Sequence, residues 1–135
     1  QSGNLVFTGP EENNLALSEK IEQGILDQFG FEVPAIVRSS EEVNELIQSN
    51  PFLADADTKQ LHVTFLKSSP VPQDTELIEN LNVLPEKLLF KSDNIFIKCA
   101  EKYSDSKLTN MFFEKKLKVP ATTRNWNTVA KLATM

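Results

Sequence analysis

Short runs of β-branched and aromatic residues alternate with amphipathic stretches along the chain, and this alternation constrains the fold more than any other feature. The clearest run is LHVTFL, residues 61–66, in which Leu61, Val63 and Phe65 alternate with polar residues. A period of two residues is typical of a strand. The sequence therefore predicts an α+β or α/β chain. Its 135 residues, 40% of them hydrophobic, suffice for one compact domain or two small packed subdomains.

The first fifty residues show the pattern strand, helix, strand, helix. Residues 4–8 are predicted as a strand, and residues 15–30 as a helix whose final glycine is a C-cap. Residues 32–39 are predicted as a second strand, although Pro34 restricts it to an edge or a strand start. Ser39, followed by acidic residues, is a typical start for the next helix.

After residues 61–66, the sequence predicts a short helix, a hairpin and two further helices. The short helix covers residues 74–82, and the hairpin covers residues 87–99 with its turn at residues 92–94. We expect Ser104, Asp105 or Ser106 to cap the next helix, with an apolar face of Leu108, Met111 and Phe112 that extends through Phe113 and Leu117. We expect Thr122 or Thr123 to cap the last helix, whose apolar positions are Trp126, Val129, Ala130 and Ala133.

Several kinds of functional site find no support in the sequence. All four glycines lie at or before Gly30, which excludes a glycine-rich phosphate loop later in the chain. The only histidine, His62, is interpreted as structural or merely exposed, and the only cysteine, Cys99, as a small buried hydrophobic residue. The acids Asp55 and Asp57 are interpreted as solvated rather than metal-binding. We therefore predict no metal site and recognise no catalytic constellation. Without an apolar run long enough to cross a bilayer or a secretory opening, we expect a soluble, cytoplasmic protein without membrane contact.

Charge is distributed unevenly along the chain. The net charge is -5, but residues 1–97 hold six basic and sixteen acidic residues, whereas residues 98–135 hold eight basic and three acidic ones. An acidic protein is a poor binder of nucleic acid, because phosphate affinity comes from clustered cations. The basic end could attract a small anion, or it could balance the acidic remainder of the chain; the sequence favours neither alternative.

The segment TTRNWNT, residues 122–128, suggests where an anion would bind. If the last helix begins near Thr123, Arg124 and Asn127 lie on its outer face. A second predicted helix start lies at SKLTN, residues 106–110, and two helix N-termini that converge would form an anion site. The alternative is that these groups cap helices and fasten one element to another. The candidate ligand-binding residues are Lys107, Thr109, Asn110, Arg124, Asn125 and Asn127.

Five segments in order carry a family resemblance: QSGNLVF, VPAIVRS, LHVTFL, SKLTN and KVPATTRNWNTVAKL. The chain resembles the bacterial family called domain of unknown function sixteen-ninety-seven. The resemblance implies an α+β fold of two subdomains, with residues 1–50 as a ferredoxin-like first subdomain and residues 51–135 as a mixed second subdomain that ends in two helices. It also implies that a preceding strand, helix and strand are missing here. We expect the sheet edge that this exposes to pair with another chain, by self-association for example, or to be covered in another way.

Two functional hypotheses follow, because the resemblance brings no established activity. The first is a non-enzymatic domain that binds a small anionic molecule or a partner. The alternative is an enzyme acting on a phosphorylated or carboxylated small molecule, whose site the missing N-terminal segment completes. A third hypothesis, RNA contact by the basic end, is weaker, because few aromatic side chains there are available for stacking on bases.

Overall fold

A four-stranded antiparallel sheet organises the structure, with the strand order β2-β3-β1-β4. The computed structural model describes residues 4, 6–7, 13–54, 57–100, 103 and 106–134. Its elements are α1 (Asn14–Phe29), α2 (Ser40–Ser49), η1 (Thr58–Gln60), β1 (Leu61–Leu66), α3 (Pro72–Glu79), β2 (Lys87–Lys91), β3 (Asn94–Lys98), α4 (Asn110–Leu117), β4 (Ala121–Asn125) and α5 (Trp126–Ala133). The protein is thus α+β, as the sequence predicts.

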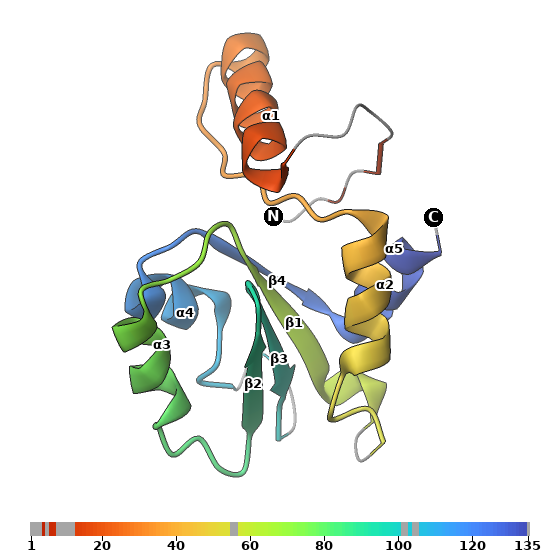
Figure 1. Ribbon diagram of the computed structural model, residues 1–135, viewed down its shortest axis with the longest axis vertical. Helices are drawn as coiled ribbons and strands as arrows, with labels where there is room; N and C mark the ends of the chain where they lie inside the picture. Colours follow the sequence, from red (N-terminus) through yellow and green to blue (C-terminus); the bar gives the residue numbers. More distant parts are fainter. Residues whose placement is uncertain are drawn as a thin grey trace.

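Helices cover both faces of the sheet, α2 and α5 on one side and α3 and α4 on the other (Figure 1). Strand β1 is buried over its whole length, because its side chains alternate between two hydrophobic clusters. Leu61, Val63 and Phe65 pack with Trp126 under α2 and α5. The opposite cluster, under α3 and α4, contains Leu66, Ile78, Ile95, Ile97, Cys99, Leu108, Phe113, Leu117 and Ala121.

The hairpin and most helix boundaries follow from local sequence signals. Ser39 forms a capping box with Glu42 at the start of α2, and Gly30 ends α1 in the left-handed conformation with φ 77°. The β2–β3 hairpin turns at Ser92, whose φ is 53°. These three predictions are confirmed.

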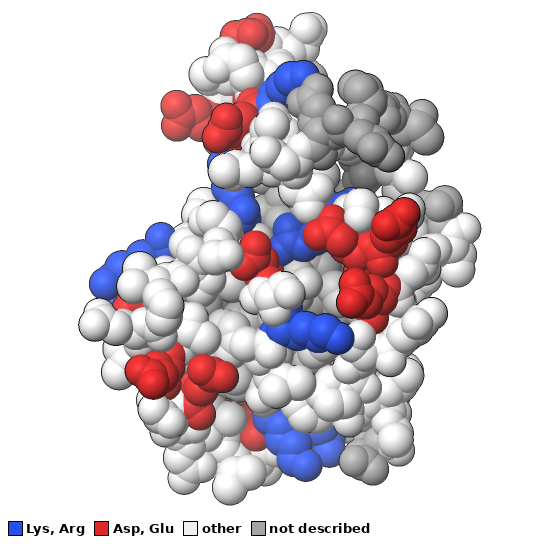
Figure 2. Space-filling view, in the orientation of Figure 1, with Lys and Arg blue, Asp and Glu red and all other residues white. Residues whose placement is uncertain are grey.

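The acidic residues of α2 form part of an acidic surface in Figure 2.

The strand predicted over residues 32–39 does not form. This segment is irregular and pairs with no strand in the described part of the chain. Its polar groups bond elsewhere instead. The Ala35 N–H donates to Glu22 Oε2 (2.8 Å), and Arg38 donates to the carbonyls of Leu66 (2.8 Å) and Asp93 (2.9 Å). Arg38 thereby fastens the segment to the end of β1 and to the hairpin turn. A strand was also predicted at residues 4–8. Of these residues, Asn4, Val6 and Phe7 are described and are not in a strand, and the other two lie outside the described residues.

No strand precedes β1 in the described part of the chain, so the ferredoxin-like arrangement of residues 1–50 remains a prediction. Helix α1 stands apart from the sheet in Figure 1. Glu22 connects it to the rest of the structure through an ion pair with Lys67 (2.6 Å). Burial alone would raise the pKa of Glu22, but its hydrogen bonds to Lys67 and Ala35 lower it below 4.5.

The C-terminal helices begin later than predicted. Thr109 caps α4. Of the three predicted caps, Ser106 lies before Thr109 in the chain, and Ser104 and Asp105 lie outside the described residues. The buried face of α4 consists of Phe113 and Leu117, while Met111 is exposed. Residues 121–125 are strand β4 rather than the start of the last helix, because they pair with β1. Asn125, not Thr122 or Thr123, caps α5.

Replacing Trp126 tests the packing of α5 on β1. The indole is 4% exposed and contacts the cluster on that face of the sheet. We expect Trp126→Ala to lower the free energy of unfolding by about 3–5 kcal/mol, because a large cavity is left behind. Urea denaturation followed by far-UV circular dichroism measures this loss. Leu77→Ala, at a side chain 68% exposed, is the control and should change stability by less than about 0.5 kcal/mol. Equal stabilities of the two variants would contradict the packing.

Candidate functional site

Arg124, a predicted ligand-binding residue, bonds to neighbouring parts of the protein. It lies on β4, so it is not on the outer face of the last helix, where the sequence placed it. Its guanidinium donates to Asn4 Oδ1 (2.8 Å), Thr122 Oγ1 (2.6 Å) and the Thr123 carbonyl (3.0 Å). Partial burial lowers its pKa. These contacts are those of a fastening residue, which is the structural alternative that the sequence left open.

The start of α4 is also bonded internally. Thr109 Oγ1 accepts the Phe112 N–H (3.2 Å), and the Asn110 N–H donates to the Tyr103 hydroxyl (2.7 Å). The Asn110 side chain donates to the Ala121 carbonyl (2.9 Å) and accepts from Thr123 Oγ1 (3.0 Å). Thr109 and Asn110 therefore join α4 to β4 and to Tyr103.

Asn125 and Asn127 lie on an open polar hollow of about 710 Å³ between η1, the start of β1 and the start of α5. Its lining consists of Asp57, Thr58, Lys59, Gln60, His62, Ala100, Tyr103, Asn125 and Asn127. The sixth candidate, Lys107, lies elsewhere, on the groove described below. The structure thus brings together two of the six candidate residues at one hollow, and the other four do not line it.

His62 lies beneath this hollow and is only 8% exposed. Its ring stacks on Tyr103 with centroids 4.6 Å apart, and its Nδ1 lies 3.9 Å from Cys99 Sγ. Burial lowers the pKa of the imidazole below 6.5, while a hydrogen bond with the Gln60 backbone acts in the opposite direction. Neutral histidine is therefore the form that the folded protein favours.

A hydrogen-bonded chain leads from Tyr103 into the core. Tyr103 accepts from Asn110, which accepts from Thr123. Because the Thr123 proton is committed to Asn110, the fully buried Thr64 must donate to Thr123 across 2.7 Å. Sequence reasoning missed this chain. The only sequence signal for this chain is Thr64, a threonine at a buried position of β1. Thr123, the partner of Thr64, is recognisable only once the register of β1 and β4 is known.

The described residues supply neither a metal centre nor an activated thiol. No cluster of three or more histidine, cysteine, aspartate or glutamate residues among them could hold a metal ion. Burial raises the pKa of Cys99 to about 11, so its thiol stays protonated near neutral pH. Among the helices described, none has the length and apolar character needed to cross a membrane.

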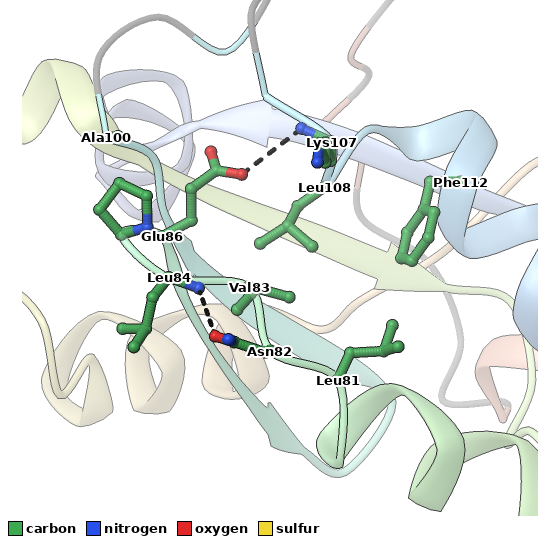
Figure 3. Close-up of a pocket in the computed structure, with 10 residues that line it drawn as sticks. Leu81, Asn82, Val83, Leu84, Glu86, Ala100, Lys107, Leu108 and Phe112 are labelled. Carbon is green, nitrogen blue, oxygen red and sulfur yellow. Dashed lines mark hydrogen bonds between the residues drawn. The ribbon is translucent and has the colours of Figure 1, made fainter.

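A second, more apolar groove of about 480 Å³ separates α4 from the segment between α3 and β2. Leu81, Val83, Leu108 and Phe112 point into it in Figure 3. The Lys107 N–H donates to Glu86 Oε1 (3.4 Å) at one end.

Asn110 tests whether the hydrogen-bonded chain stabilises the fold. Asn110→Ala should lower the free energy of unfolding by about 1–3 kcal/mol, because it removes a donor to the Ala121 carbonyl and the acceptor of the Thr123 hydroxyl. Chemical denaturation measures the change, with the exposed Asn44→Ala as the control. A double-mutant cycle with Thr123→Val should show coupling, and strictly additive losses would contradict the chain.

His62 should make stability depend on pH. Its pKa is lower in the folded state, so the unfolded chain takes up the proton first as pH falls below about 6.5. The free energy of unfolding should therefore decrease between about pH 7 and about pH 5. His62→Gln should show a smaller decrease in the same denaturation series. Glu22 and Glu42, whose pKa values are lowered from 4.5, act below this range. Parallel curves for the two proteins would contradict the assignment.

Comparison with known proteins identifies a family. No curated protein and no solved structure matches the chain significantly. Residues 1–96 match the family described as "Protein of unknown function (DUF1697)". The match ends within β3, so all six candidate ligand-binding residues lie beyond it. It covers well over half of the chain, and the chain therefore belongs to the DUF1697 family.

Proposed function

We propose that the polar hollow beside α5 binds a small anionic molecule, with a carboxylate or phosphate group directed at the start of the helix. The observation that carries the proposal is that the N-terminal end of α5 and the cation Lys59 border the same hollow. The first N–H groups of a helix have no acceptor within it, and the helix dipole favours an anion there. The Asn125 side chain accepts the Thr128 N–H (2.8 Å). The anion would therefore be directed at the two preceding N–H groups, those of Trp126 and Asn127.

The walls of the hollow also limit what fits. Asp57 caps η1 by accepting the Lys59 N–H (3.0 Å), and its negative charge disfavours a polyanion. Neutral His62 and Tyr103 form an aromatic floor. The site therefore suits a small ligand with one anionic group and further polar atoms rather than a nucleic-acid backbone.

The enzyme alternative has less support in this hollow. His62 is stacked and pairs with Cys99, a thiol that stays protonated. The Tyr103 hydroxyl accepts the Asn110 N–H. These groups hold the local structure together, so binding needs fewer assumptions than a reaction located here.

Amide NMR tests the proposal with inorganic phosphate and malonate as probes. Resonances of Trp126, Asn127 and Lys59 should shift together and saturate. Lys59→Gln and Asn127→Ala should each weaken binding by roughly tenfold, because each removes a hydrogen bond or charge from the anion. Lys131→Gln, a lysine in the last turn of the same helix, is the matched control and should bind normally.

Two results would contradict the proposal. One is an absence of saturable shifts at the start of α5. The other is an equal loss of affinity in Lys131→Gln, which would indicate general charge attraction instead of this site.

A further inference from the structure

Within the described part of the structure, the sheet face that α2 and α5 cover remains open over β2. On this side β2 carries Lys87, Leu89 and Lys91, which are exposed, Leu89 by 44%. Helix α2 packs mainly on α5, and neither helix lies over the β2 edge (Figure 1). An exposed leucine between two lysines is thus left on an otherwise covered face.

Two lysines face each other on this open area. Lys87 and Lys98 are direct partners in the β2–β3 register, and like charges opposite each other destabilise a sheet. Neither forms an ion pair within the described residues. Lysines on an edge strand discourage edge-to-edge pairing, but Lys98 lies on the inner strand β3, where that explanation fails.

The same face of the molecule carries acidic residues over α2, next to the lysines over the sheet (Figure 2). Glu42 is used in the capping box and bonds to Asn14. Glu41 and Glu45 are exposed and make no ion pair with any described residue. Residues four apart on a helix lie about 5–6 Å from each other, close to the spacing of about 5 Å in a cross-strand pair.

We propose that this face binds a second copy of the chain, with Glu41 and Glu45 of each copy against Lys87 and Lys98 of the other. A two-fold dimer needs a surface that is complementary to itself. A face that bears both an acidic pair and a basic pair of similar spacing, neither with an ion-pair partner among the described residues, meets that need. Leu89 supplies apolar area between the charges. Each copy has a net charge of -5, so association must come from this local match and should weaken as salt screens it.

Sedimentation velocity over a roughly hundredfold concentration range tests the proposal, since dimer formation depends on concentration. The wild-type chain should form a dimer that high salt weakens. The double variants Lys87→Glu/Lys98→Glu and Glu41→Lys/Glu45→Lys should each weaken self-association by roughly tenfold or more. An equimolar mixture of the two variants should form a heterodimer, because every acidic pair then faces a basic pair. Lys115→Glu/Lys116→Glu, exposed lysines on α4 with the same charge change, should still form the dimer.

Circular dichroism first confirms that all variants are folded, which is the expected result because every substituted position is exposed except Lys98, which is half-buried. A wild-type chain that stays monomeric throughout the range would overturn the proposal. So would a dimer that both double variants retain, or a mixture of them that fails to associate. Weakening of the dimer by the α4 control alone would assign the interface to the opposite face.

Discussion

Burial of β1 on both faces is the constraint on which the rest of the structure depends. This strand lies inside the sheet. Leu61, Val63 and Phe65 belong to the cluster with Trp126, and Leu66 belongs to the cluster with Phe113 on the other face. A strand covered on both sides needs helices on both sides, which explains why α2 and α5 lie opposite α3 and α4. The same burial encloses the polar Thr64 completely and leaves His62 only 8% exposed, so Thr64 requires a partner within the protein and His62 has little contact with water.

Those partners connect the core to the surface. Thr64 is satisfied by Thr123 and, through it, by Asn110, while His62 stacks on Tyr103. Because Tyr103 also accepts from Asn110, the start of α4, strand β4 and the wall of the polar hollow form one bonded unit. A ligand in that hollow would contact groups whose positions the core already fixes, and preorganisation of this kind reduces the entropy that binding costs. The charged face over α2 and β2 lies elsewhere and has no bonds to this unit among the described contacts.

The sequence predicted part of the candidate site and misjudged its geometry. Asn125 and Asn127 do border the hollow, and the start of the last helix is one of its walls. Arg124 was assigned to that helix because a helical period fits residues 124–131, but pairing with β1 takes residues 121–125 into the sheet. The strand predicted at residues 32–39 failed for the opposite reason: its residues have strand propensity, but among the described residues no neighbouring strand offers the hydrogen bonds that a strand requires.

By itself the sequence determined the α+β class, the buried strand at residues 61–66, the hairpin, the end of α1 at Gly30 and the start of α2 at Ser39, because each depends on residues close together in the chain. Only the tertiary structure decided that residues 121–125 extend as β4, that Asn110 bonds to Thr123, and that His62 meets Tyr103 beside the start of α5. These contacts join residues far apart along the chain or depend on strand register. No local pattern encodes them, and the packing of the whole sheet selects them.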